Sequence, residues 1–395
     1  MRKSTQPEIK INYLFSLKND KKHMLKVKQN STSKSAIKTQ TLDFLRGVAA
    51  MYVVLNHLRG VFFKGGSRTL AEAADLNFYD YISLAILQIT SLGTEFVILF
   101  FFISGFTMAH SISQNTSVAK FLLRRLIRMW PPYLLAVFLS FGCCLLFAVF
   151  LPENQITGRC EDLLCTVHGL IKISLYFDVV TPITSQFWSL PYEVIFYLIC
   201  PLILTNKYRI KAVLIVVIVS SICGCIWYGF GLLPSDIILI NFLINALLFF
   251  MVGAYFYDHV HLIPIIRPKA FAFLLFLLFM STYTIKILIG GPNLISSCIM
   301  VLIAAVSIKN IPLSISGIKW LNLGFFSYSL YIFHMVLIYL CVFFLDIFWN
   351  LQANDISHYW AWLLPLPIVI LGSWFLYFVS ERKCNLILIK LRAKY

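Results

Sequence analysis

Charged side chains are scarce in this sequence. Asp, Glu, Lys and Arg make up only 13% of the 395 residues, about half the share of an ordinary soluble domain, whereas hydrophobic residues make up 59%. The mean hydropathy of the chain is +0.82. This composition excludes a soluble globular protein. We predict an all-α, polytopic bundle with about ten transmembrane helices.

The usual signatures of a metal or nucleotide site are also missing. The ten cysteines include no C-x-x-C pair, and no Gly-rich phosphate loop follows a strand. We therefore predict no metal and no tightly bound cofactor. Cys160 and Cys165 lie together in a polar loop. They could form a disulfide if that loop is outside the cytoplasm, and free thiols fit equally well.

Long apolar stretches, by contrast, follow one another from residue 42 to residue 380. Each is close to the roughly 20 residues that cross the hydrocarbon of a bilayer. The predicted spans are 42–63, 86–109, 131–151, 187–205, 211–229, 235–256, 270–289, 293–309, 322–345 and 359–380. Residues 1–41 precede this 42–380 domain as a basic tail, and residues 381–395 follow it as a short basic tail.

Positive charge is spread unevenly over this layout. One side of the membrane would hold 26 of the 33 Lys and Arg residues, ten of them in the 1–41 tail, and the other side only six. Because segments rich in Lys and Arg stay in the cytoplasm, both termini are predicted to be cytoplasmic. We expect the 1–41 tail to orient the protein or contact anionic lipid, not nucleic acid.

The stretch Leu42–Leu58 carries ionisable residues that a bilayer disfavours. An arginine at the bilayer centre costs at least ~2.5 kcal/mol, so Arg46 is a functional candidate by default. Arg46 and His57 project from nearly one helix face, roughly 16 Å apart along the axis. The structural alternatives are a pair between Arg46 and Asp43, one turn earlier, and a histidine hydrogen-bonded inside the bundle.

Two further polar positions lie in the predicted span 86–109. Ser104-Gly105, in FFISGF, is typical of helices that approach each other closely. Glu95 lies in the middle of the membrane, and we expect Arg46 or a histidine as its partner.

Five short motifs together resemble the acyltransferase 3 family, whose members are membrane acyltransferases that modify cell-surface carbohydrates. The motifs are LRGVAAMYVVLNH (45–57), FFISGF (101–106), RRLIRMWPPY (124–133), FWSLPYEVIFYLICPLI (187–203) and FSYSLYIFH (326–334). They occur in the family's order and cover the chain from about residue 42 to 380. One departure is the ending: the family often has Glu-Arg-Pro after the last span, whereas Glu381-Arg382 is followed here by Lys383.

The resemblance implies that His57 is the family's essential histidine and that Arg46 accompanies it as a required residue. A neutral imidazole can take the proton of a sugar hydroxyl during acyl transfer, or carry the acyl group itself. The resemblance also implies coenzyme A as the carrier of the acyl donor. Arg124, Arg125 and Arg128 are candidates to hold its phosphates, and ordinary cytoplasmic anchoring is their alternative role.

Glu193 lies in FWSLPYE, which resembles the family's WSL-x-x-E motif. We place it at the outer start of a span, with Trp188 as an interfacial anchor and Ser189 as a cap. The carboxylate would then orient His57 or bind a sugar hydroxyl. Its alternative is an acid favoured by the helix dipole.

One further set of polar residues is spaced to share a helix face in the span 322–345. Such a face is either a polar packing seam or a wall that meets the substrate. The set is Ser327, Tyr331 and His334, and Trp188 and Ser189 are further candidates to face the substrate.

The sequence therefore predicts an integral-membrane O-acyltransferase with His57 as general base. By family habit it uses acetyl-CoA from the cytoplasmic side and O-acetylates a cell-envelope polysaccharide, lipopolysaccharide or glycolipid at the bacterial inner membrane. The alternative is a proton-coupled transporter or flippase, which also uses intramembrane Arg, His and Glu. Against it, the sequence shows no paired Gly/Pro-broken helices in corresponding halves.

Overall fold

The computed structural model describes most of the chain from residue 40 onward. The described residues are 40–62, 78–113, 117–154, 156, 160, 173–175, 182–204, 211–216, 218–219, 222, 246–289, 294–311, 323–349 and 361–394. The 1–41 tail, except its last two residues, lies outside them. So do Cys165 and about half of each of the predicted spans 211–229 and 235–256.

Every regular element in the described part is a helix. After a first helix over residues 40–62 come α3 (Phe78–Ile89), α4 (Gly93–Ser113), α5 (Val118–Phe150), the 3-10 helix η1 (Pro182–Ser189), α8 (Leu190–Leu204), α11 (Leu248–His259), η3 (Val260–Leu262), α12 (Pro268–Ile289), α13 (Leu294–Asn310), η4 (Leu323–Phe326), α15 (Ser327–Trp349), η6 (Ala361–Leu363), α16 (Pro365–Val379) and α17 (Glu381–Lys394). The predicted all-α class is confirmed.

Five segments of the described chain are long and apolar enough to cross a membrane: Leu87–Ser113, Val118–Phe150, Ile183–Leu204, Pro268–Ile289 and Leu323–Trp349. The protein is thus a multi-pass membrane protein. The number of ten spans and the cytoplasmic position of both termini stay predictions.

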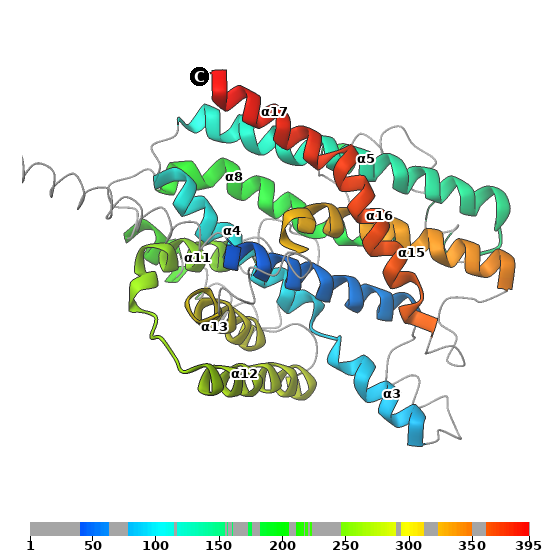
Figure 1. Cartoon of the computed structure of the whole chain (residues 1–395), viewed down its shortest axis with the longest axis horizontal. Coiled ribbons are helices and arrows are strands. Elements are labelled where there is room, and N and C mark those ends of the chain that lie inside the picture. The colour runs from blue at the N-terminus through cyan, green and yellow to red at the C-terminus, as the bar shows by residue number, and fades with distance from the viewer. Residues whose placement is uncertain are drawn as a thin grey trace, which may run out of the picture.

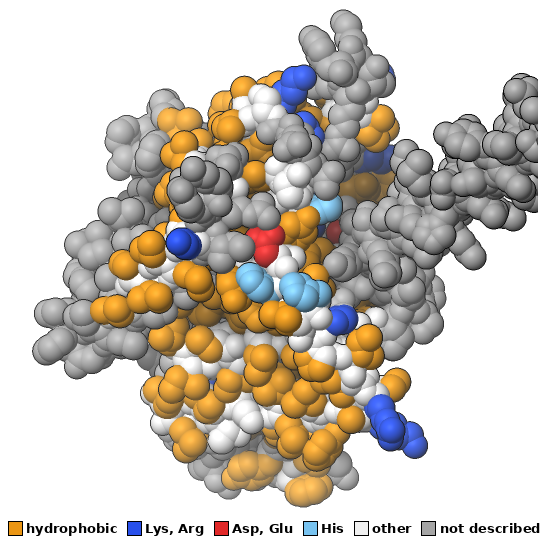
Figure 2. Space-filling model, turned by 90° about the vertical axis from the view of Figure 1, so that its left-hand side faces the viewer, with side chains coloured by type: hydrophobic (Ala, Val, Ile, Leu, Met, Phe, Trp, Pro, Cys, Tyr) orange, Lys and Arg blue, Asp and Glu red, His pale blue; other side chains and the backbone are white. Residues whose placement is uncertain are grey.

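The helix over residues 40–62, dark blue in Figure 1, runs through the middle of the bundle, with α5 and α17 on one side and α12 and α13 on the other. Helix α4 is central: 72% of its apolar span is buried, against 6% for α12. Figure 2 shows the end of the bundle that lies on the left in Figure 1, where Lys, Arg and His side chains are scattered among hydrophobic ones. The polar site described below therefore sits on the innermost helices.

Two glycines allow α4 and α11 to pack with their backbones in contact. A Cβ atom on Gly105 would lie 1.8 Å from the Phe250 carbonyl oxygen, and one on Gly253 would lie 2.0 Å from that of Phe102. No side chain fits at such distances. The expectation that Ser104-Gly105 permits close helix approach is confirmed.

Helix α5 differs from the predicted span 131–151, because it begins thirteen residues earlier, at Val118. Pro131 and Pro132 lie inside the helix and do not start it. Proline is tolerated there because neighbouring segments of a membrane bundle can satisfy the backbone groups that it frees. The three arginines of RRLIR thus belong to a continuous 33-residue helix.

Residues 381–394, expected to be a short basic tail, form helix α17. It runs beside α5 (Figure 1) and contacts it along its length. Its first residue, Glu381, is only 1% exposed. The low hydropathy of this segment suggested a tail, but one buried carboxylate and a row of apolar side chains are enough to dock it.

Glu95 does not pair with Arg46 or a histidine, as we had expected. Its carboxylate forms a 2.8 Å ion pair with Lys286 of α12 and accepts a 3.1 Å hydrogen bond from Ser296 of α13. Lys286 lies in the last turn of α12, which directs its ammonium group onto α4. This buried pair stabilises the contact of α4 with α12 and α13.

The backbone contact at Gly105 leads to a stability prediction. Gly105→Ala should lower the thermal unfolding midpoint, because overpacking of this kind costs about 1–3 kcal/mol. Gly142→Ala is the matched control, since a Cβ there meets nothing within 4 Å. It should leave the midpoint unchanged or raise it slightly through helix propensity. Equal midpoints for the two variants, measured in one detergent, would contradict the contact.

Candidate functional site

A polar pocket lies inside the bundle where six segments meet. Its cavity volume is about 80 Å³, so in this conformation it has room for only part of a small-molecule ligand. Its walls come from the helix over residues 40–62, α4, α5, η1, α8 and α15. Its chemically active lining is Arg46, Ser104, Thr107, Arg125, Arg128, Ser189, Glu193, Tyr197, Ser327 and Tyr331.

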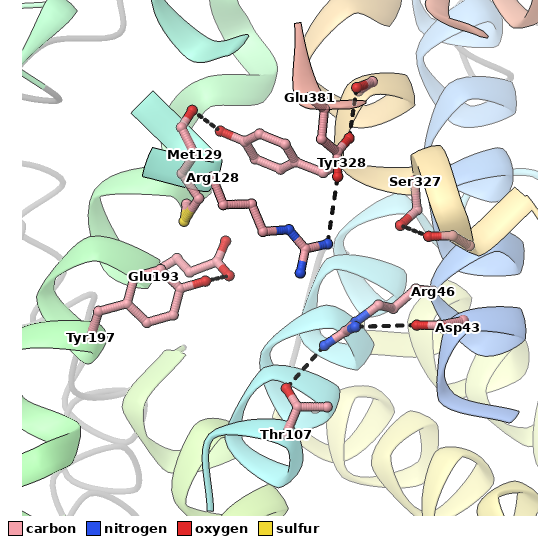
Figure 3. Close-up of polar contacts among 12 residues, drawn as sticks. Asp43, Arg46, Thr107, Arg128, Met129, Glu193, Tyr197, Ser327, Tyr328 and Glu381 are labelled. Atoms are coloured by element: carbon pink, nitrogen blue, oxygen red, sulfur yellow. Dashed lines mark hydrogen bonds and ion pairs between the residues drawn. The ribbon is translucent and has the colours of Figure 1, made fainter. Parts of the chain in front are cut away.

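Arg46 is held at the pocket by two partners (Figure 3). Its guanidinium donates to the Thr107 hydroxyl at 2.9 Å and pairs with Asp43 at 3.5 Å, so the pair expected one turn apart is present. The helix is pressed against η4, because a Cβ on Gly324 would lie 1.8 Å from the Asp43 carbonyl oxygen. Ser327 follows η4 and donates back to the Gly324 carbonyl oxygen at 2.9 Å.

Arg128 is oriented by the C-terminal helix. Its guanidinium pairs with the Glu381 carboxylate at 3.5 Å, and the other carboxylate oxygen accepts a 2.7 Å hydrogen bond from Ser329. Figure 3 shows the Arg128 side chain extending from α5 into the space between Glu381 and Arg46. Burial raises the pKa of the Glu381 carboxyl above its ordinary value, and Arg128 and Ser329 act against that rise.

Arg124 and Arg125 lack such partners. The ion pairs in the described part of the chain join Asp43 to Arg46, Arg128 to Glu381 and Glu95 to Lys286, so neither Arg124 nor Arg125 has a described carboxylate within ion-pairing distance. Arg125 lies over the rings of Phe121 and Tyr197 at 5.4 and 5.3 Å. Arg124 donates to the Lys120 carbonyl oxygen. Arg125 therefore lines the pocket with no described ion pair, and the Glu193 carboxylate lines the same pocket.

Glu193 lies beside these arginines, not at the outer start of its span. The helix begins at Pro182 as η1 and continues directly into α8, which places Glu193 well inside it. Its carboxylate accepts hydrogen bonds from Tyr197 and, at 3.4 Å, from Ser104. These described contacts are at the arginine end of the pocket, and the expectation that Glu193 orients His57 or binds a sugar hydroxyl stays a prediction.

Tyr331 closes the far side of the pocket. Its hydroxyl contacts the Ser189 hydroxyl at 2.7 Å and donates to the Gln186 carbonyl oxygen at 2.8 Å. Its ring meets Phe100 edge to face at 5.6 Å. Trp188, expected as an interfacial anchor, packs its ring edge-on against Phe101 inside the aromatic cluster.

His57 and His334 lie on the other side of Tyr331. Their ring centroids are 5.1 Å apart, and the Tyr331 ring is 5.9 Å from that of His334. His334 is fully buried, and its Nε2 atom has no hydrogen-bond partner. The neighbouring Asn56 fixes this end of the helix, because its amide donates to the Thr90 carbonyl oxygen at 2.8 Å.

The face that carries Ser327, Tyr331 and His334 is therefore divided. The first two residues line the pocket, and the third contacts the ring of His57, which does not itself line the pocket. Sequence reasoning missed Thr107, Tyr197 and Glu381. For Glu381 a signal existed in the sequence. Glu381 and Arg382 match the first two residues of the family's Glu-Arg-Pro ending, and only the third residue differs.

Chemically, the pocket is suited to bind an anion, and it lies beside the buried imidazoles of His57 and His334. The three arginines at the pocket suit phosphates, and a pair of buried imidazoles suits proton transfer. The layer formed by Tyr331 and Phe100 lies between the two. A donor with an anionic head and a slender, reactive tail would fit a site of this shape.

Comparisons with known proteins agree with this geometry. The chain is 35% identical over 124 residues to the acyltransferase MdmB of Streptomyces mycarofaciens, a stretch that spans 31% of each chain. No solved structure matches the chain. A family model described as an acyltransferase domain matches residues 40–379, nearly the whole of the bundle. The chain therefore belongs to the acyltransferase 3 family of membrane acyltransferases.

Proposed function

We propose that the protein transfers an acetyl group from acetyl-CoA to a hydroxyl of a cell-envelope polysaccharide or glycolipid, with His57 as general base. The observation that carries this proposal is the pocket lined by three arginines, one wall of which, Tyr331, contacts the ring of His334 beside His57. Family membership supplies acyl transfer, and the charges and shape of the site support the choice of donor.

The pocket suits the anionic part of coenzyme A. The phosphates would meet Arg125, which has no described carboxylate partner, and Arg128. The pantetheine arm carries two amide groups on a slender chain. The Glu193 carboxylate would accept from one amide N–H, and Arg46 and the hydroxyl side chains of the pocket would donate to its carbonyl oxygens. The bundle end with scattered Lys and Arg (Figure 2) would face the cytoplasm, where acetyl-CoA is found.

The reaction then needs one proton acceptor. His57 takes the proton of the acceptor hydroxyl as its oxygen forms a bond with the thioester carbonyl carbon. The carbon–sulfur bond then breaks, the acetyl group stays on the acceptor oxygen, and the sulfur takes the proton from His57, so that coenzyme A leaves as the free thiol. His334 is a positioning residue, because its ring lies against His57 and holds the imidazole facing the Tyr331 layer.

Water must be kept from the thioester between turnovers. The Tyr331 hydroxyl is tied to Ser189 and Gln186, and its ring is packed on Phe100. We propose that this layer separates the pocket from His57 while the site is empty. We propose that this layer opens when the donor and the acceptor are both bound. A closed site then protects the acetyl group from hydrolysis.

His57→Ala is the direct test of the general base. We expect transfer of radiolabelled acetyl from acetyl-CoA to a bacterial envelope glycan extract to fall by about 10²–10⁴-fold, with the dissociation constant for acetyl-CoA nearly unchanged. His261→Gln is the control, since His261 is exposed beyond α11, and should transfer acetyl at the wild-type rate. Wild-type turnover by purified His57→Ala protein would contradict the assignment.

Arg125→Met tests donor binding. The variant keeps a long side chain against Phe121 and Tyr197 but removes the unpaired charge. We expect KM for acetyl-CoA to rise about tenfold or more, with a smaller change in kcat, because a charged hydrogen bond to a phosphate is lost. Arg382→Met, at an exposed position against Phe378, is the control. An unchanged KM in Arg125→Met would place the phosphates elsewhere.

A further inference from the structure

A second cavity adjoins the pocket, between α5 and the C-terminal helix α17. Its cavity volume is about 300 Å³. Arg125 and Arg128 line both cavities, so the two meet at these guanidinium groups. The proposed acyl transfer does not require this second cavity, which we call the α5–α17 groove. Its other lining residues include Arg124, Phe121, Asn385 and Leu388.

Helix α17 is fixed in place and forms a permanent wall of the groove. Its first residue, Glu381, is buried and bound to both Arg128 and Ser329. One turn on, Cys384 is buried at 6% exposure, and Leu388 is buried at 8%. In Figure 1, α17 lies alongside the first half of α5. The groove therefore exists before any ligand arrives.

The charge of the groove selects for an anion. The Arg128 charge is balanced by Glu381, but Arg124 and Arg125 have no described carboxylate within ion-pairing distance. Two guanidinium groups near each other repel, so a ligand that brings negative charge between them is stabilised. One inorganic phosphate would use only part of the space.

The remaining lining indicates what the anion is attached to. Phe121 and Leu388 offer an apolar surface, and the Asn385 amide can donate to and accept from the edge of a heterocyclic base. An apolar surface, one amide and a row of guanidinium groups suit a nucleotide that carries more than one phosphate. A lipid headgroup would use the charges but not the amide and the flat apolar wall.

We propose that the α5–α17 groove binds the 3′-phosphorylated adenosine diphosphate end of the acyl donor, so that α17 is part of the active site. The pantetheine arm passes between Arg125 and Arg128 into the pocket and points toward Tyr331. This inference rests on the proposed use of a coenzyme A thioester. It assigns a ligand to Arg124, Asn385 and Leu388.

The test uses full-length protein in nanodiscs made of zwitterionic lipid, with adenosine 3′,5′-bisphosphate as probe. This nucleotide carries two of the phosphates of coenzyme A but lacks the pantetheine arm. We expect it to bind wild type and to compete with acetyl-CoA. Leu388→Trp fills the groove and Asn385→Ala removes its amide, and each should weaken nucleotide binding about tenfold. Ile387→Trp, on the exposed face of α17, should stay within about twofold.

A truncated donor distinguishes this inference from the proposed function. Acetyl-pantetheine lacks the nucleotide, so Leu388→Trp and Asn385→Ala should consume it as fast as wild type does. The groove assignment is overturned if these variants bind the nucleotide like wild type, or if only anionic lipid occupies the groove. The proposed function fails instead if wild type consumes neither acetyl-CoA nor acetyl-pantetheine. Nucleotide binding is measured without turnover and decides the groove assignment in either case.

Discussion

The structure depends on one constraint: a charge inside an apolar bundle must have a partner or a ligand. Arg46 is held by Asp43 and Thr107, and Arg128 by Glu381 and Ser329. A paired charge costs much less free energy inside the bundle than an uncompensated charge in hydrocarbon. Each pair also fixes the position of a helix. Arg125 is different, because it lines the pocket with two aromatic rings against its guanidinium and no described ion pair. In the proposed function, this is the place where the bundle receives an anion.

The second feature is the division of the site by Tyr331. Ser327 and Tyr331 line the pocket, and the Tyr331 ring is 5.9 Å from that of His334, which lies against His57. In the proposed function, the motif that contains Ser327, Tyr331 and His334 is polar because it connects the donor pocket to the base.

Much of this was predictable from the sequence, and the failures have a common cause. Composition and span length predicted the helical membrane class, and local spacing predicted the Arg46–Asp43 pair and the close packing at Gly105. Contacts between distant segments were not predictable. Arg128 and Glu381 are 253 positions apart, and no local pattern indicates that they pair. Glu193 was misplaced because hydropathy does not locate the start of a helix that begins with a 3-10 turn.

A structure with a non-hydrolysable acetyl-CoA analogue bound would test the central claim most directly. We claim that the arginine-lined pocket and the His57–His334 pair form one acyl-transfer site. The account predicts that the phosphates lie beside Arg125 and that the carbonyl group of the analogue lies against Tyr331, on the side that faces His57. Density for the analogue in another part of the bundle, or a carbonyl group directed away from His57, would contradict it.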